Sequence, residues 1–260
     1  MKRIFFLIAF SSITIQLFAW SQTGHRVVGE IASQYITSKT KRAIKEILGN
    51  ESIAMASNWA DFIKSEPSMK QYDAWHYINF KSGLAFAEFN AYLQTDTAVD
   101  AYTKLNFLIG ELKNKDLPVE QKRMYLRLLI HIVGDIHQPL HVGRPDDLGG
   151  NRVKVMWFNE STNLHSVWDG ALIDFQKLSY TEYAASINFV SKEERKQWQQ
   201  QRLPEVFFDS YLLAEKIYAG ITQPDQKLGF RYNYDYIAML NTQLLKGGVR
   251  LAGILNSIYA

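Results

Sequence analysis

The stretch HIVGDIHQPLH, residues 131–141, closes a strong helical pattern that begins near Pro118. Proline is tolerated in the first turn of a helix but not in its interior, so Pro118 and Pro139 bracket a predicted helix. His131 and Asp135 are four residues apart, and both therefore project from one face of that helix. The stretch thus places an imidazole and a carboxylate side by side, close to the point where the helix must end.

The rest of the chain carries the same helical periodicity, with apolar residues recurring every three or four positions. This pattern predicts helices over 27–36, 43–48, 53–64, 96–114, 118–138, 204–219 and 233–258. Only Val153–Trp157 alternates like a strand, and it follows a turn at Gly149–Gly150, which predicts half of a small hairpin. We therefore expect one all-α, mainly helical domain with a small β-hairpin and no internal repeat.

Residues 1–19 have the pattern of a secretion signal. Lys2 and Arg3 form a short basic start, a mostly apolar run follows, and Ala19 supplies the small residue preferred at the cleavage site. A membrane-spanning helix needs about 20 apolar residues, and this run is shorter. We predict a cleaved signal peptide over 1–19, one domain over 20–260, a periplasmic or secreted location and no membrane anchor.

Composition excludes several classes of function. Without residues 1–19 the chain has 27 basic and 26 acidic residues, a net charge of +1. A duplex-binding protein would show a stronger basic bias. The chain has no cysteine, which excludes disulfides, thiol nucleophiles and thiolate metal ligands. Any transition metal would be held by histidine, carboxylate and backbone groups.

The six histidines provide such ligands. His165 and Asp169 repeat the four-residue spacing found in the long helix, and His141 follows that helix directly. A single pair of this kind is equally typical of a salt-bridged helix, whereas two pairs with a third imidazole favour a metal site. In the absence of thiolate, imidazole and carboxylate are the ligand set of zinc. The spacing predicts a multinuclear zinc site. His137 has no Asp partner at this spacing, so we expect it to support a ligand from behind or to be structural.

The order of these residues resembles that of the single-strand-specific zinc nucleases, also 3′-nucleotidases and often called the S-one/P-one family. They share a superfamily with bacterial zinc phospholipase C. In the family the mature chain begins with Trp, and the metal ligands follow in a fixed order. The matching positions are Trp20, His25, Asp61 in WAD, His76 in WHYIN, His131, Asp135, His141, His165 and Asp169. The tail GGVRLAGILN, 247–256, is similar to the family's last helix.

The resemblance implies a phospholipase C/nuclease-like fold and three Zn²⁺ per chain. The implied groups are Asp61, His76, His131 and Asp135 on one ion, His141, His165 and Asp169 on a second, and Trp20, His25 and Asp135 on a third. Trp20 would bind through its free α-amine and its carbonyl oxygen, and Asp135 would bridge two ions. Signal cleavage would then create a ligand, because only a chain that begins at Trp20 has an amine there.

The resemblance also implies the reaction and its substrates. A zinc-bound hydroxide would attack phosphodiesters of single-stranded DNA or RNA and release 5′-nucleotides, and 3′-nucleotides would be substrates too. Asp61 would orient the attacking water. Lys64 stands where the family commonly has a phosphate-binding Arg; it keeps the charge but loses the bidentate fork, and an exposed helix lysine is the alternative. Tyr77 would stack on a nucleobase, unless it is a core aromatic, and Asn79 would bond the base edge.

Two other functions remain open at this point. A zinc-dependent phospholipase C would have the same fold and nearly the same ligands, but those enzymes typically carry Glu where this chain has Asp169, and HYIN fits the nuclease pattern. A zinc-binding or storage protein without enzymatic activity is the other alternative. No obligate protein partner is evident from the sequence.

Overall fold

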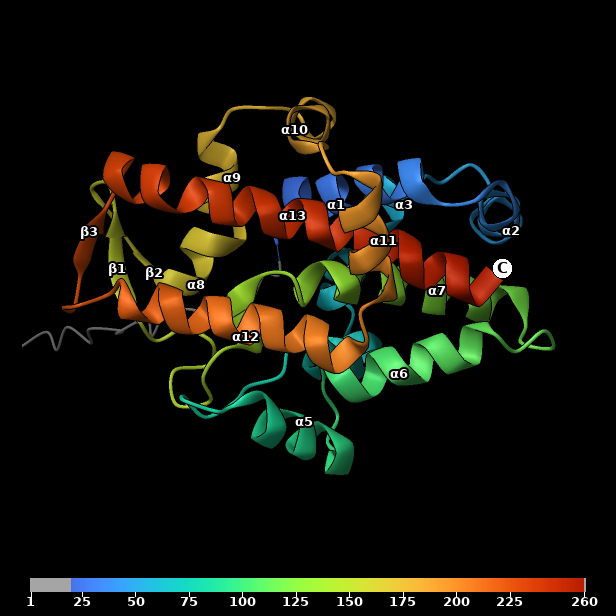
Figure 1. Cartoon of the computed structure of the whole chain (residues 1–260), viewed down its shortest axis with the longest axis horizontal. Coiled ribbons are helices and arrows are strands. Elements are labelled where there is room, and N and C mark those ends of the chain that lie inside the picture. The colour runs from blue at the N-terminus through green and yellow to red at the C-terminus, as the bar shows by residue number, and fades with distance from the viewer. Residues whose placement is uncertain (1–19, 260) are drawn as a thin grey trace, which may run out of the picture.

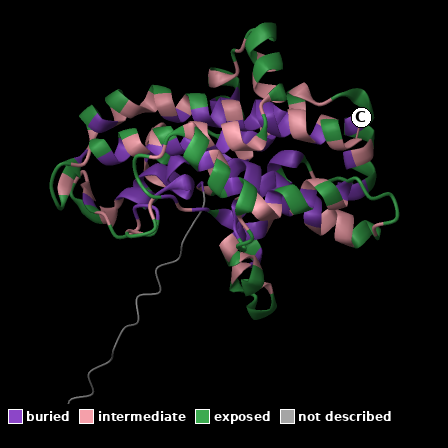
Figure 2. Cartoon of the chain, turned by 60° about the horizontal axis from the view of Figure 1, so that its bottom comes forward, coloured by how far each residue is buried: buried purple, intermediate pink, exposed green. Residues whose placement is uncertain are grey.

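The helix that carries the quoted stretch is α7, Val119–Asp135, in a computed structural model that describes residues 20–259. Every residue from 128 to 143 is buried, so the end of α7 and the break after it lie in the interior. Figure 1 shows the longer helices arranged around this segment, and Figure 2 shows the buried residues gathered between them. The predicted signal peptide, 1–19, falls outside the described residues.

Around α7 pack α1 (Gln22–Tyr35), α2 (Ser38–Leu48), α6 (Ala101–Leu112) and α13 (Phe230–Tyr259). Shorter helical segments connect α2 to α6: α3 (Ile53–Ala56), α4 (Trp59–Phe62), η1 (Ile63–Ser65), η2 (Pro67–His76) and α5 (Phe86–Thr95). After α7 come η3 (Pro139–Val142), α8 (Leu164–Ser166), η4 (Val167–Ala171), α9 (Leu172–Phe175), α10 (Tyr180–Ile187), α11 (Lys192–Gln200) and α12 (Leu203–Ala219). The predicted mainly helical domain is confirmed. No helix within 20–259 is long and apolar enough to cross a membrane.

A small sheet lies at one end of the helical body (Figure 1). The predicted hairpin is present as β1 (Lys154–Trp157) and β2 (Glu160–Asn163), which pair antiparallel with Val155 opposite Thr162. A third strand, β3 (Gln226–Leu228), runs parallel to β1 on its other edge. The sequence pattern did not predict β3, because its pairing partner lies about seventy residues earlier in the chain.

Several predicted helices have wrong bounds: α7 ends at Asp135 instead of Gln138, and α1 and α2 begin at Gln22 and Ser38. Two further differences have a visible polar cause. The predicted helix over 53–64 is interrupted after α3, where the carbonyl of Ser57 accepts a hydrogen bond from the ring of His131 at 2.6 Å. The predicted helix over 96–114 begins only at Ala101, because the carboxylate of Asp100 caps it by accepting from the backbone N–H of Thr103. Both differences come from polar side chains that bond the backbone.

The most extensive helix contact in the body joins α1 and α13. A Cβ on Gly248 of α13 would lie 2.5 Å from Ile31 of α1, so only glycine allows the two backbones to approach this closely. Two residues further on, Arg250 is 2% exposed. Its guanidinium contacts Asp209 and Gln201 and lies 3.1 Å from Nε2 of His137. The tail segment 247–256 therefore packs α13 onto the helices that carry the predicted ligands.

Replacing Arg250 with Met is expected to lower the free energy of unfolding by about 2–3 kcal/mol, because it removes charge-assisted hydrogen bonds from a buried network. Asp209 is partly exposed and regains water, which keeps the cost at this level. Thermal unfolding measures the change. The matched control is Arg231→Met, which breaks an exposed ion pair with Asp235 and should leave Tm unchanged. Equal shifts in the two variants would contradict a structural role for the Arg250 network.

Candidate metal centre

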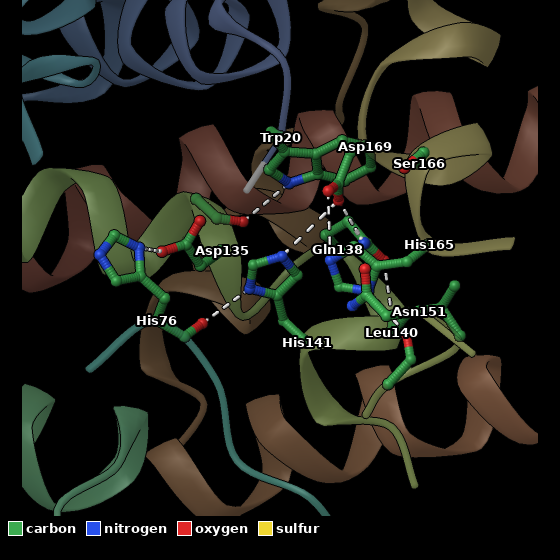
Figure 3. A network of polar contacts seen from close by, with 12 residues as sticks. Trp20, His76, Asp135, Gln138, Leu140, His141, Asn151, His165, Ser166 and Asp169 are labelled. Atoms are coloured by element: carbon green, nitrogen blue, oxygen red, sulfur yellow. Dashed lines mark hydrogen bonds and ion pairs between the residues drawn. The ribbon is translucent and has the colours of Figure 1, made fainter. Parts of the chain in front are cut away.

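The predicted metal-binding side chains come from separate elements and meet beside the end of α7. The contributing elements are α1 with His25, α4 with Asp61, η2 with His76, α7 with His131 and Asp135, η3 with His141, α8 with His165 and η4 with Asp169. Within the described chain these residues form three groups whose potential ligand atoms lie within 4.8 Å of one another. Figure 3 shows part of this cluster, with the side chains converging from different ribbons.

The first part of the cluster surrounds Nε2 of His131. This atom lies 3.0 Å from Nδ1 of His76, 3.3 Å from Oδ2 of Asp135 and 3.7 Å from Oδ1 of Asp61. Nδ1 of His76 is itself 2.9 Å from Oδ2 of Asp135. The structure therefore brings together the four residues that the resemblance assigned to one zinc ion.

His25 extends this group on its other side. Its ring stacks on that of His131 with centroids 3.9 Å apart, and its Nε2 lies 3.3 Å from Oδ1 of Asp135. The two oxygens of Asp135 thus face different histidines, which is the arrangement of a bridging carboxylate. Gly134 makes room for this ring, because a Cβ there would lie 2.7 Å from Nδ1 of His25.

A second part of the cluster forms around Asp169. Its Oδ2 lies 3.1 Å from Nε2 of His165, and its Oδ1 lies 3.6 Å from Nε2 of His141. The amide of Gln138 donates a hydrogen bond to the same carboxylate at 2.5 Å (Figure 3). Asp169, His165 and His141 are the residues that the resemblance assigned to the second zinc ion.

Backbone carbonyls fix the orientation of three of the imidazoles. Nδ1 of His131 donates to the carbonyl of Ser57 at 2.6 Å, and Nδ1 of His141 donates to that of His76 at 2.7 Å. Nδ1 of His165 donates to the carbonyl of Gly149 at 2.6 Å. Because the proton is held on Nδ1, the lone pair of Nε2 points into the cluster, as is typical of metal-binding histidine.

Burial keeps the imidazoles neutral. It lowers the pKa of His131 to about 4 and lowers the pKa values of His25 and His76 well below their usual range. Burial also lowers the pKa of His137 to about 3, but this ring donates from Nδ1 to a carbonyl of α7 and accepts from Arg250. Three cluster histidines therefore offer neutral nitrogen ligands at pH 7, while His137 is structural, as expected.

The two buried aspartates respond differently. Burial, followed by the charge of Asp61, raises the pKa of Asp135 well above its usual range. Burial alone would raise that of Asp169 as well, but His165 and His141 lower it to about 2. Nε2 of His25 and Oδ1 of Asp135 are buried and form no hydrogen bond within 20–259. A neutral imidazole nitrogen and a carboxylate oxygen that lack a hydrogen-bond partner fit a metal cation in donor type.

Trp20 lies between the two parts of the cluster. Its side chain is fully buried, and its indole N–H donates to the carbonyl of Gly134 at 2.8 Å (Figure 3). The next backbone N–H, that of Ser21, donates to the carbonyl of Asp169 at 2.5 Å. The indole therefore serves packing, and the backbone at residue 20 lies beside the cluster. That its α-amine is a ligand remains a prediction.

The predicted substrate contacts lie at the edge of the same cluster. Nζ of Lys64 is 2.5 Å from Oδ1 of Asp61 and is mostly covered, so it is not a freely solvated helix lysine. Tyr77 follows His76 and is 37% exposed, which excludes the alternative of a core aromatic. Oδ1 of Asn79 is buried without a hydrogen-bond partner among the described residues. The positions permit the predicted roles, which stay predictions.

Sequence reasoning missed several polar residues that support the cluster. Gln138 is fully buried, donates to Asp169 and accepts from the backbone N–H of Leu140 at 2.6 Å, so it positions a predicted ligand. It lies inside the stretch 131–141, between the predicted ligands Asp135 and His141, and this position could have indicated that it supports a ligand. Arg26 and Asn58 line a cavity beside the cluster, and nothing in their local spacing marked them.

Comparison with known proteins agrees with this geometry. The model of the family described as S1/P1 Nuclease matches residues 20–260. The chain belongs to the S1/P1 nuclease family. Endonuclease 3 of Arabidopsis thaliana is 31% identical over 93% of this chain and 89% of its own length. Nuclease S1 of Aspergillus oryzae is 30% identical over 63% of this chain and 59% of its own, and Nuclease P1 of Penicillium citrinum is 27% identical over 58% and 57%.

Membership of the S1/P1 nuclease family confirms the resemblance found in the sequence. The chain is a hydrolase that acts on ester bonds, and three groups of its histidines and aspartates are able to hold metal ions. The family match also favours a nuclease over the phospholipase C that the ligand pattern had left open.

Proposed function

We propose that this protein is a zinc-dependent phosphodiesterase that hydrolyses single-stranded DNA and RNA to 5′-nucleotides and also removes phosphate from 3′-nucleotides. The observation that carries the proposal is the position of Asp135, whose two oxygens face histidines from α1, η2 and α7. Cations on both sides would hold this fully buried carboxylate in its ionised form. We also propose that the protein is exported, with residues 1–19 as the signal peptide.

The side chains present fit three zinc ions. The groups that would hold them are Asp61, His76, His131 and Asp135, then His141, His165 and Asp169, then His25 and Asp135 with the α-amine and carbonyl of Trp20. Zinc bound there would lower the pKa of water toward 7 and neutralise the charge of a phosphate. This would also explain how a protein of nearly neutral net charge attracts a polyanion.

The chain's own residues supply the remaining steps. Asp61 lies at the open edge of the cluster, where its carboxylate would orient the attacking water and accept its proton. Lys64, held next to Asp61, would place its positive charge against the phosphate. Tyr77 would stack on the base that precedes the scissile phosphate, and Asn79 would bond the edge of that base. Stacking needs an unstacked base, so single strands would be preferred over duplexes.

A substrate panel with metal analysis tests the proposal. Purified protein beginning at Trp20 is expected to contain close to three zinc ions, to release acid-soluble nucleotides from denatured DNA faster than from duplex DNA, and to release phosphate from 3′-nucleotides. Dialysis against a chelator should abolish these activities, and added zinc should restore them. Full activity with one metal ion or none, or release of choline phosphate from phosphatidylcholine instead, would overturn the proposal.

A further inference from the structure

A cavity of about 640 Å³ borders the cluster. Trp20, Asp61 and Asp169 form the part of its lining that belongs to the cluster, while Tyr77 and Asn79 are not among its lining residues. The cavity is therefore a second approach to the same site, distinct from the position proposed for the base that precedes the scissile phosphate. The rest of its lining comes mainly from α1, α3 and α4, with Glu51 before α3, Ser166 of α8 and Gly170 of η4.

Large apolar side chains lie exposed around this cavity. Phe62, directly after Asp61, is 80% exposed, and Met55 on α3 is 48% exposed. Trp59 lines the same space and is itself covered on one side by the guanidinium of Arg127, 5.3 Å from the ring centroid. An aromatic ring left in water contributes nothing to the stability of the fold, but beside a site for nucleic acid it offers a stacking surface.

One residue in the wall of the cavity, Arg26, is positively charged and has no carboxylate partner in the described part of the chain. Arg26 forms no ion pair with any carboxylate among residues 20–259, and its buried Nε makes no hydrogen bond. Its guanidinium lies 6.0 Å from the ring centroid of Tyr180. The one glutamate that lines the cavity, Glu51, is instead paired with Arg127 at 2.8 Å. The site therefore has an unneutralised positive charge at its wall, suited to an anion.

Two further polar atoms in the lining have no partner in the described chain. They are the hydroxyl oxygen of Ser21 and Oδ1 of Asn58, both buried. The amide nitrogen of Asn58 donates to the carbonyl of Gln22 at 3.2 Å, which fixes the orientation of the side chain. Buried polar atoms normally find a partner, so these atoms point to a polar ligand.

We propose that this cavity binds the nucleotide that follows the scissile phosphate, with Phe62 stacking on its base and Arg26 pairing with its next phosphate. The inference rests on the proposed function. In that reaction a bond forms between the water oxygen and phosphorus, and the bond from phosphorus to the 3′ oxygen breaks. One water proton ends on the 3′ oxygen, and the phosphate stays on the nucleoside that follows.

The direction of the strand supports this assignment. The attacking and leaving oxygens of an in-line displacement lie on opposite sides of phosphorus. If Tyr77 holds the base on the side of the 3′ oxygen, the remaining strand continues past the cluster. The cavity is lined by Asp61 and Asp169, offers an exposed aromatic ring and carries an unpaired arginine, and these are the groups that a following nucleotide needs.

Three substrates of increasing length test the proposal. They are a 3′-nucleotide, a dinucleoside monophosphate and the same dinucleotide with an additional 3′-phosphate, and release of the first nucleoside is measured for each by chromatography. Phe62→Ser is expected to lower kcat/KM for both dinucleotides by about 5- to 100-fold and to leave the 3′-nucleotide unchanged. Arg26→Gln should lower kcat/KM about 10-fold for the dinucleotide with the additional phosphate alone.

Two controls match these changes elsewhere on the surface. Phe189→Ser removes a phenylalanine that is also 80% exposed, and Arg231→Gln removes an arginine outside the cavity; neither should affect any of the three substrates. Tyr77→Ala should weaken all three. Equal losses on the 3′-nucleotide and the dinucleotides for Phe62→Ser or Arg26→Gln would overturn the proposal. Zinc-loaded wild-type protein that hydrolyses none of the three would instead overturn the proposed function, and this inference with it.

Discussion

Replacing Asp135 with Asn is expected to remove two equivalents of bound zinc and to lower kcat/KM by more than about 100-fold. Changing a residue that only supports a ligand costs up to about 100-fold, and Asp135 would itself be a ligand. Asp135 is fully buried, and its oxygens lie 2.9 Å from His76 and 3.3 Å from both His131 and His25. An amide has the same shape but lacks the charge, and its nitrogen would face an imidazole or a cation. Elemental analysis after dialysis and turnover of a 3′-nucleotide measure the effect.

The comparison variant is His25→Ala, which removes a residue that the bridging arrangement assigns to a single ion. It should cost one equivalent of zinc and less activity than Asp135→Asn. Asp174→Asn, on the exposed face of α9, changes the same functional group outside the cluster and should cost neither. If Asp135→Asn and His25→Ala lose the same single equivalent, Asp135 does not bridge two ions.

The long helices and the order of the candidate ligands could be predicted because both depend on local spacing. Pro118 and Pro139 bracket α7 closely, and four-residue spacing puts His131 beside Asp135 on any helix. The stacking of His25 on His131 could not be predicted in this way, because it depends on how α1 packs against α7. The resemblance placed His25 in the ligand set without giving its neighbours.

Among the helices that were missed, α10 and α11 each have a signal in the sequence. α11 has no buried residue, so hydrophobic periodicity, which guided the prediction, is absent from it. Ser191 and Glu194 nevertheless form a capping box that starts α11, and Ser179 and Glu182 do the same for α10. The pattern of Ser followed three residues later by Glu is readable in a sequence and would have predicted both helix starts.

The residues that line the cavity beside the cluster could not be predicted from the sequence, for a different reason. Arg26 and Phe62 are each adjacent in sequence to a candidate ligand, but adjacency alone does not tell whether a side chain faces the cluster, the core or the solvent. That Arg26 lacks an ion pair is visible only when every carboxylate around it is placed, including Glu51, which belongs to Arg127. A feature that consists of a missing partner, such as an arginine without an ion pair, can be recognised only in the folded structure.

A chain that retains one residue before Trp20 is expected to bind one zinc ion fewer and to turn over substrates at least about tenfold more slowly than a chain that begins at Trp20. A free α-amine has a pKa near 8, so a metal ion displaces its proton at little cost, whereas a peptide nitrogen is not basic and is a poor ligand. The backbone at this position lies beside the cluster, since the N–H of Ser21 donates to the carbonyl of Asp169.

The control is Trp20→Phe in a chain that begins at residue 20, because it keeps the amine and the carbonyl and changes only the indole. Phe cannot donate to the carbonyl of Gly134, but this carbonyl still accepts from the backbone N–H of His137, so the loss of one hydrogen bond should lower the free energy of unfolding by about 1 kcal/mol. Zinc content should stay at three, with most of the activity retained. Full activity and three zinc ions in the extended chain would show that the amine is not a ligand; loss of zinc in Trp20→Phe alone would mean that the indole orders the site. The opposite pattern, loss in the extended chain with retention in Trp20→Phe, makes removal of residues 1–19 the step that completes the metal centre.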